Sequence, residues 1–207
     1  MPHLKNNYIA DDTKSEFAEK ALGTFKRIFA YESNVNTLKL CLMVFNQLIW
    51  SEQLCQKYEQ FIPDLVSLFS TSSTVVYGQI LKALYQFVRK SASAKNTMKA
   101  NLIFPLVEII EITPLTAYPI IILALKVLVE LSGDAETRKK ILEFGQSDFF
   151  DHLSILMSAN SEILVSTCGQ LLCLVKILSI LFSFEFGFQF YPIKWPFLKS
   201  SLSLSLK

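Results

Sequence analysis

The chain repeats its own apolar pattern at an offset of 41 residues. When residues 55–99 are placed on residues 96–140, identical residues coincide at helical spacing. The identical pairs are Ile62/Ile103, Leu65/Leu106, Val66/Val107, Tyr77/Tyr118, Ile80/Ile121, Ala83/Ala124, Leu84/Leu125 and Val88/Val129. An internal repeat of this length with two helices per unit is typical of a stacked α-solenoid.

The repeat continues on both sides of this segment. Leu125 corresponds to Leu172 and Leu128 to Val175 at an offset of 47, which predicts a six-residue insertion near residues 145–148. Residues 13–54 resemble a degenerate earlier unit. We therefore predict an all-α fold, a right-handed α-α superhelix of about four units, at about residues 13–54, 55–95, 96–140 and 141–180.

The two ends of the chain depart from the repeat. Residues 1–12 are predicted to be a disordered lead-in. Residues 181–207 form an atypical tail with alternating phenylalanines and then Ser-Leu repeats. The phenylalanines could form an edge strand, fold back over the last helices or promote aggregation. We interpret the tail as a truncated or alternatively spliced end that replaces further repeats.

The composition is compatible with a solenoid and with a membrane protein. Hydrophobic residues make up 51% of the chain and charged residues only 18%, against about 25% in a typical domain. Ala117–Leu131 is shorter than the roughly 20 residues that cross a bilayer. Cys168–Phe188 is long enough but carries Lys176 and Glu185. A membrane-associated protein anchored through about residues 168–190 remains the alternative.

Several segments resemble an armadillo repeat. Pro63–Phe69 matches the Pro-x-Leu-Val-x-Leu-Leu-like stretch of the second helix, and Ala83–Phe87 and Ala124–Leu128 match the Ala-Leu-x-x-Leu pattern of the third. The resemblance implies that the third helix lines a concave surface. Nuclear-transport and adhesion members carry a ladder of Asn there that binds a peptide backbone. The equivalent residues here are Val44, Gln86, Val127 and Leu174, of which only Gln86 suits that role.

A basic stretch supplies the candidate binding residues. No carboxylate lies between Asp64 and Glu108, whereas five Lys or Arg residues do. Lys82, Gln86 and Arg89 are spaced i, i+4, i+7 and share one helix face, which the resemblance assigns to the concave groove. With Lys126 they are the candidate contacts for an acidic segment of a partner protein. An ordinary solvated helix face is the alternative, and nucleic acid is disfavoured because the charges are few and no aromatic residues lie among them.

No motif for catalysis is found. The chain lacks a Gly-rich phosphate loop, HExxH and GxSxG. Cys168 and Cys173 lie five residues apart on one expected helix and face different directions, so we expect neither a metal nor a cofactor. Four cysteines without a CxxC pair, and no secretory signal, favour a reducing, cytoplasmic compartment. The expected function is a non-enzymatic protein-binding scaffold, or the non-catalytic repeat segment of a larger multidomain protein.

Overall fold

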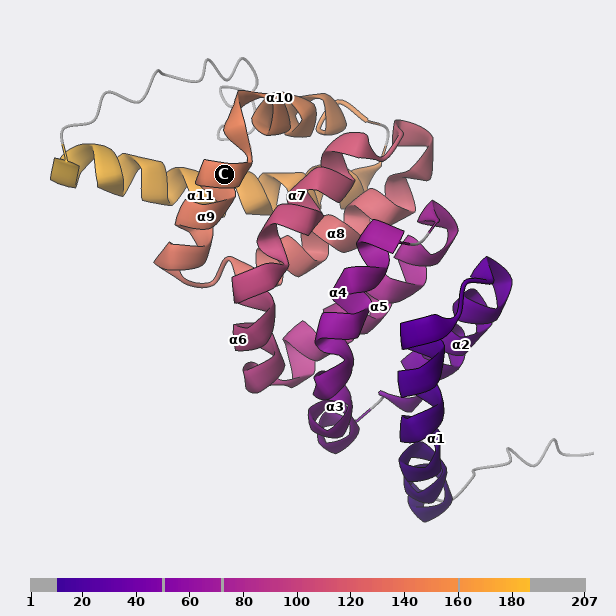
Figure 1. Ribbon diagram of the computed structural model, residues 1–207. Helices are drawn as coiled ribbons and strands as arrows, with labels where there is room; N and C mark the ends of the chain where they lie inside the picture. The colour runs from indigo at the N-terminus through magenta and orange to yellow at the C-terminus, as the bar shows by residue number, and fades with distance from the viewer. Residues whose placement is uncertain (1–10, 50, 72, 160, 187–207) are drawn as a thin grey trace, which may run out of the picture.

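The protein is a stack of helices. The computed structural model describes residues 11–49, 51–71, 73–159 and 161–186, and every regular element within them is helical (Figure 1). The prediction of an all-α fold is confirmed. In chain order the elements are α1 (Asp11–Tyr31), α2 (Val35–Leu48), α3 (Glu52–Tyr58), η1 (Glu59–Phe61), α4 (Ile62–Thr71), α5 (Thr74–Lys90), α6 (Ala92–Asn101), α7 (Ile103–Ile112), η2 (Leu115–Ala117), α8 (Tyr118–Leu131), α9 (Ala135–Phe144), α10 (Gln146–Leu156) and α11 (Glu162–Phe186).

The helices recur in triplets, each with two shorter helices followed by a longer one. The triplets are α3 to α5, α6 to α8 and α9 to α11, and they are preceded by the pair α1 and α2. The most extensive contacts join α2 to α5, α5 to α8 and α8 to α11. The last helix of each unit therefore packs on the last helix of the unit before it, and α1 with α2 forms one end of the stack (Figure 1).

Side-chain caps set where several helices begin. Ser51, Ser73 and Ser91 accept a hydrogen bond from a backbone N–H in the first turn of α3, α5 and α6. Asp134 does the same for α9, with Thr137 N–H donating at 2.8 Å, which confirms the predicted N-cap. Pro119 lies in the first turn of α8, where a missing N–H costs no helical hydrogen bond.

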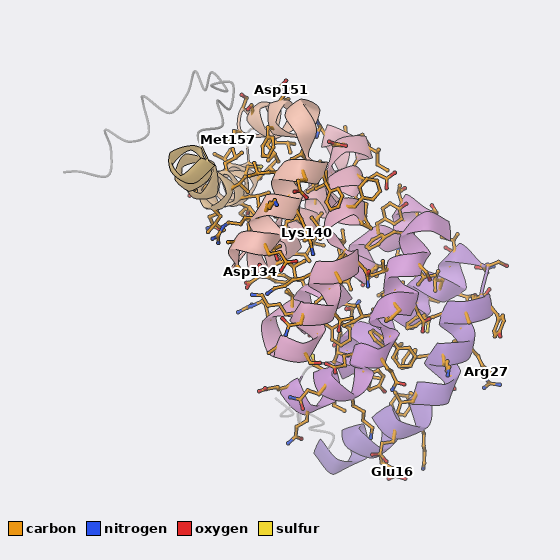
Figure 2. The ribbon with its side chains drawn as sticks, turned by 60° about the vertical axis from the view of Figure 1, so that its left-hand side comes forward. Glu16, Arg27, Asp134, Lys140, Asp151 and Met157 are labelled. Carbon is orange, nitrogen blue, oxygen red and sulfur yellow. The ribbon has the colours of Figure 1, made fainter. Side chains whose placement is uncertain are left out.

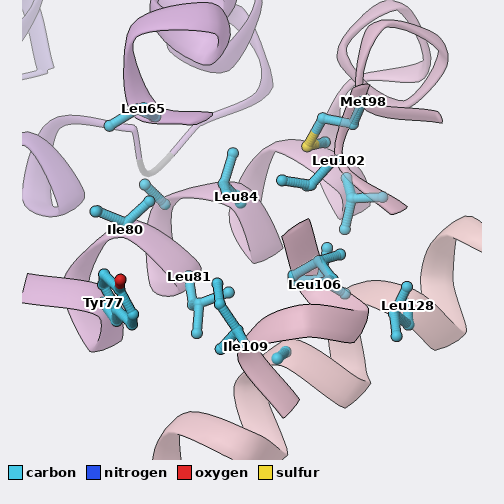
Figure 3. Close-up of a cluster of buried hydrophobic side chains, with 14 of the residues drawn as sticks. Leu65, Tyr77, Ile80, Leu81, Leu84, Met98, Leu102, Leu106, Ile109 and Leu128 are labelled. Atoms are coloured by element: carbon cyan, nitrogen blue, oxygen red, sulfur yellow. The ribbon is translucent and has the colours of Figure 1, made fainter. Parts of the chain in front are cut away.

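One continuous hydrophobic core runs through the stack. Its first part is aromatic: the fully buried Phe45 ring lies 5.2 Å from the Phe25 ring and 5.3 Å from those of Phe29 and Tyr58. Its middle part is aliphatic, where Leu84 of α5 and Leu106 of α7 belong to one buried cluster (Figure 3). The apolar positions that repeat in the sequence are thus the positions that hold adjacent units together.

The predicted insertion at residues 145–148 is wrong. Gly145 alone separates α9 from α10, just as Leu102 alone separates α6 from α7. The buried residues of α10 match those of α7 at an offset of 43, with Phe149 on Leu106 and Leu153 on Ile110. The offset of 47 inferred from the sequence is four residues too large. Four residues are about one helical turn, so apolar residues still coincide on nearly the same side of the helix.

Gly145 is required by this tight connection. A Cβ atom there would lie 2.6 Å from Cδ1 of Phe149 and 2.8 Å from the carbonyl oxygen of Ile141. The absence of a side chain lets the buried Phe149 ring close the corner between α9 and α10.

The ends of the described chain differ from the sequence expectation. Helix α1 begins at Asp11, two residues before the predicted start. Helix α11 continues to Phe186, so residues 181–186 are helical, and the edge strand, one of the three alternatives for the alternating phenylalanines, does not form there. Residues 1–10 and 187–207 lie outside the described residues. In the described ranges, no helix is both long enough and apolar enough to cross a membrane.

Candidate protein-binding surface

The three candidate residues on α5 share one side of that helix. Lys82 and Arg89 are exposed and Gln86 is half-buried, while the intervening Ala83, Leu84 and Phe87 are fully buried. The fourth candidate, Lys126, is half-buried on α8 at the position equivalent to Tyr85, 41 residues earlier. The amphipathic pattern of α5 therefore presents the predicted stripe away from the core.

A groove of about 530 Å³ lies between α2 and α5 beside this stripe, and we call it the α2–α5 groove. It brings together Lys82 and Gln86, whereas Arg89 and Lys126 are not among its lining residues. The lining contains two lysines, four side-chain amides and no carboxylate. Its residues are Met43, Asn46, Gln47, Gln79, Lys82, Tyr85, Gln86 and Lys90.

Hydrogen bonds across the groove hold α2 and α5 together. The Asn46 Nδ2 donates to the carbonyl oxygen of Gln79 at 3.0 Å, and Gln86 Nε2 donates to the carbonyl oxygen of Asn46 at 3.2 Å. Lys90 Nζ donates to Gln86 Oε1 at 3.1 Å and to the carbonyl oxygen of Ile49, just past the C-terminal end of α2, at 3.2 Å. A cation at a helix C-terminus is stabilising because the last carbonyls carry partial negative charge.

These hydrogen bonds involve the side-chain amides of Gln86 and Asn46. Both groups of the Gln86 amide are engaged within the protein, as donor to α2 and acceptor from Lys90. The Asn46 Oδ1 is buried and has no hydrogen-bond partner in the described residues. A buried amide oxygen left without a donor is costly. The atom exposes almost no surface, so a group bound in the groove does not reach it.

Arg89 belongs to a different contact. Its Nε lies 3.9 Å from Oε1 of Glu130 on α8, and its guanidinium carbon lies 5.6 Å from the centre of the Tyr85 ring. Arg89 and Glu130 are equivalent residues of adjacent units, 41 apart. Among the described residues, no carboxylate forms an ion pair with Lys82 or Lys126. The positive charge is therefore compensated at Arg89 and uncompensated at the two lysines.

Sequence reasoning missed the half of the groove that α2 contributes. Asn46 and Gln47 are two adjacent amides that follow the apolar run Leu40–Phe45, and that change of polarity was the available signal. Lys90 was counted in the basic stretch but was not placed on the same face as Lys82. In α5 it lies eight residues after Lys82, which returns it to nearly the same side of the helix.

Three of the four cysteines are buried. The four cysteines are free, and burial raises the pKa of Cys41 and Cys55 to about 11 and that of Cys168 to about 12. Such thiols stay protonated and unreactive at neutral pH. Within the described residues, no three His, Cys, Asp or Glu side chains gather where they could hold a metal ion.

Solved structures share this arrangement of helices. The chain matches a designed armadillo repeat protein in complex with the peptide (KR)4, with a TM-score of 0.61 and 18% identity over 74% of this chain and 63% of that one. The fold is that of an armadillo/HEAT-like α-solenoid. A second match is the crystal structure of an engineered protein, a structural-genomics target, with a TM-score of 0.61 and 16% identity over 77% of this chain and 62% of that one.

The α-solenoid spans less than two thirds of the length of either matched structure. No protein-family model matches the sequence, and neither does any curated protein. The predicted resemblance to armadillo and HEAT repeats is confirmed at the level of the fold. Helices α2, α5 and α8 are the ones to which the armadillo resemblance assigned the concave surface.

Proposed function

We propose that the chain is a non-enzymatic scaffold that binds an acidic, extended segment of a partner protein in the α2–α5 groove. The observation that carries the proposal is the lining of that groove, which has two lysines, four amides and no carboxylate. Amide groups suit the polar backbone of an extended peptide, and lysines suit its acidic side chains.

The solved neighbour supports a peptide rather than another kind of ligand. That designed protein is in complex with (KR)4, a basic peptide. In the present chain residues 65–107 include five basic residues and no acidic one, so they carry the same sign of charge as that peptide. The same type of scaffold would therefore take a peptide of the opposite sign.

The polar residues in the groove and beside it are assigned distinct roles. Lys82 and, on α8, Lys126 attract carboxylates because no acidic group of the described chain pairs with them. Asn46 acts indirectly, because its Nδ2 donates to the carbonyl oxygen of Gln79 and holds α2 against α5. Gln86 acts indirectly, because its amide holds α2 and Lys90 in place. Arg89 contributes less, because Glu130 already compensates its charge.

The proposed setting is a reducing, cytoplasmic compartment. All four cysteines are free, and three of them are buried. Free thiols of this kind are typical of proteins that stay in a reducing environment.

A binding titration tests the proposal. A fluorescently labelled oligo-glutamate peptide is added to the full chain, and its anisotropy is measured at several salt concentrations. We expect saturable binding that weakens as salt is raised, because the attraction is between exposed charges. The Lys82→Glu, Lys126→Glu double variant is expected to bind about tenfold more weakly, a change of about 1.4 kcal/mol.

The matched control is Lys139→Glu on α9, an exposed lysine paired with Glu143 outside the groove. Because it removes positive charge elsewhere, it is expected to leave the affinity within about twofold. The control changes the net charge by half as much as the double variant, so a loss of binding free energy half as large would show that only net charge matters. Preference for a (KR)4 peptide over oligo-glutamate would overturn the proposed sign of the partner.

A further inference from the structure

Two large side chains give the α2–α5 groove an apolar part among its amides and lysines. Met43 lines the groove from α2, and Tyr85 lines it from α5. Met43 is 45% exposed. The other methionines that the structure describes differ, because Met98 is fully buried and Met157, just after α10, is half-buried against the core (Figure 2). Apolar surface at Met43 therefore remains unburied in the groove, and a ligand with carboxylates alone would not use it.

The Tyr85 ring is held in place by its own contacts. It is half-buried and packs against the core, and the guanidinium carbon of Arg89 lies 5.6 Å from the centre of the ring. Arg89 in turn lies beside Glu130 of α8, with 3.9 Å between Nε and Oε1. An aromatic ring fixed in this way offers a preformed apolar surface, and little side-chain entropy is lost when a ligand packs on it.

Met43 and Tyr85 occupy equivalent positions in successive units. Each immediately precedes one of the aligned residues Val44 and Gln86, and Lys126 holds the same position on α8. Since α2 packs on α5 and α5 on α8, the series across the stack is methionine, tyrosine and lysine. Packed helices lie about 8–10 Å apart and an extended chain advances about 3.3 Å per residue, so a bound segment spends about three residues on each helix. Such a segment meets apolar surface on α2 and α5 and positive charge on α8.

A positive charge lies beside the apolar part of the groove. Lys82 and Tyr85 are three residues apart on α5, which is about 4.5 Å along the helix axis and on nearly the same side. Both line the groove, and no carboxylate of the described residues pairs with Lys82. Neighbouring residues of an extended segment are about 3.3 Å apart. A segment that packs an apolar side chain on Tyr85 therefore brings the residues next to it close to Lys82, where a carboxylate is favoured.

We propose that the acidic segment bound in the α2–α5 groove carries a large apolar side chain, which packs on Met43 and Tyr85 while neighbouring carboxylates pair with Lys82 and Lys126. This inference rests on the proposed function, because it concerns the same groove and adds a requirement for the partner. Charge attracts many acidic proteins alike, whereas an apolar contact at a fixed place distinguishes segments of equal charge. The partner is thus an acidic segment that includes an apolar residue, rather than a uniformly acidic tract.

The first test compares two labelled peptides of equal length and charge, oligo-glutamate with its central residue replaced by phenylalanine or by serine. Anisotropy titrations of the full chain are expected to show about tenfold tighter binding of the phenylalanine peptide. The ratio should persist as salt is raised, because salt screens charges and both peptides carry the same charge. Equal affinities for the two peptides would overturn this inference and leave the proposed function standing. Failure of both peptides and of oligo-glutamate to bind would overturn the proposed function, and this inference with it.

The second test locates the apolar contact. Met43→Gln keeps the length of an exposed side chain but makes it polar, and it is expected to reduce the preference for the phenylalanine peptide to less than about threefold. The matched control is Leu40→Gln on the same helix, at a 62% exposed residue that does not line the α2–α5 groove. It is expected to keep the tenfold preference. A preference that survives Met43→Gln, or one that only Leu40→Gln removes, would overturn the assignment, and the latter would place the apolar side chain between α1 and α2.

Discussion

The α2–α5 junction and the α5–α8 junction pack equivalent helices but differ in the side chains that lie between them. The half-buried Gln86 corresponds to the fully buried Val127, and Gln79 corresponds to Ile120. Amides cross the first junction with hydrogen bonds, while apolar side chains fill the second. The residues of the inner core hardly change between units, whereas the residues at the edge of the same junction do.

This difference separates the framework from the binding surface. Ala83 and Ala124, or Leu84 and Leu125, are identical because any change would disturb a fully buried contact. At the edge a polar residue is tolerated if its hydrogen bonds are made, and it then leaves a groove that can receive a ligand. We therefore expect the α2–α5 junction to tolerate changes that the α5–α8 junction does not.

The largest expected effect comes from placing the glutamine of the α2–α5 junction at the equivalent position of the α5–α8 junction. Val127→Gln places an amide at a fully buried position of α8 without designed partners. We expect the free energy of unfolding to fall by about 2–3 kcal/mol, because an unsatisfied amide is buried. Urea denaturation followed by circular dichroism measures this change. A loss of unfolding free energy below about 0.5 kcal/mol would mean that the α5–α8 junction accommodates a polar side chain as readily as the α2–α5 junction.

The turns that lead into α6 and α9 give the next prediction. Asp134, which leads into α9, pairs with Lys99 of α6 at 2.5 Å, and Ser93, in the first turn of α6, donates to Glu59 of η1 at 3.1 Å. Asp134 also caps α9. Asp134→Ala is expected to lower the free energy of unfolding by about 1–2 kcal/mol. Ser93→Ala, at an exposed position, is the matched control and is expected to cost less than about 0.5 kcal/mol.

The Asp134 contribution depends on pH in a defined direction. Burial raises the pKa of Asp134, but hydrogen bonds from Lys99 and Thr137 outweigh it and lower the pKa to about 2 from 3.8. A carboxyl group with a lowered folded-state pKa stabilises the protein above its unfolded pKa and loses that effect as it is protonated. The difference between wild type and Asp134→Ala should be constant above about pH 5 and should shrink between pH 4 and pH 2. A difference that keeps its full size at pH 2 would assign the effect to the cap alone.

The smallest expected effect comes from replacing the glutamine of the α2–α5 junction with an apolar residue. Gln86→Leu removes the hydrogen bond to the Asn46 carbonyl but adds apolar contact, so the free energy of unfolding should change by no more than about 1 kcal/mol. Peptide affinity should fall more clearly, because Lys90 loses the acceptor that positions it. A large loss of stability with unchanged affinity would make Gln86 a structural residue only.

The sequence predicted the framework because core positions obey simple periodicity. The internal offset of 41 residues identified the buried residues of α4, α5, α7 and α8, and the Asp134 cap follows from one side chain and its local backbone. The slip at residues 145–148 shows the limit of this method. Residues four apart lie on nearly the same side of a helix, so an apolar stripe alone does not fix the register to better than one turn.

The candidate site was only half predictable for a different physical reason. Lys82 and Gln86 follow from the spacing within one helix, but the facing Asn46 and Gln47 depend on how α2 packs against α5. The same packing decides that the Gln86 amide is engaged internally and that Arg89 is compensated by Glu130. Tyr77 and Tyr118 show this too: they match in the repeat, yet Tyr77 is buried and Tyr118 is 49% exposed.

The most direct test of the account is to locate the bound acidic peptide. Hydrogen–deuterium exchange of the full chain, with and without oligo-glutamate, is predicted to show new protection in α2 and α5, weaker protection in α8 and none in α10. The Lys82→Glu, Lys126→Glu double variant should lose this protection. Protection centred on α10, or binding without any protection in α2 and α5, would contradict the claim that the α2–α5 groove is the binding surface.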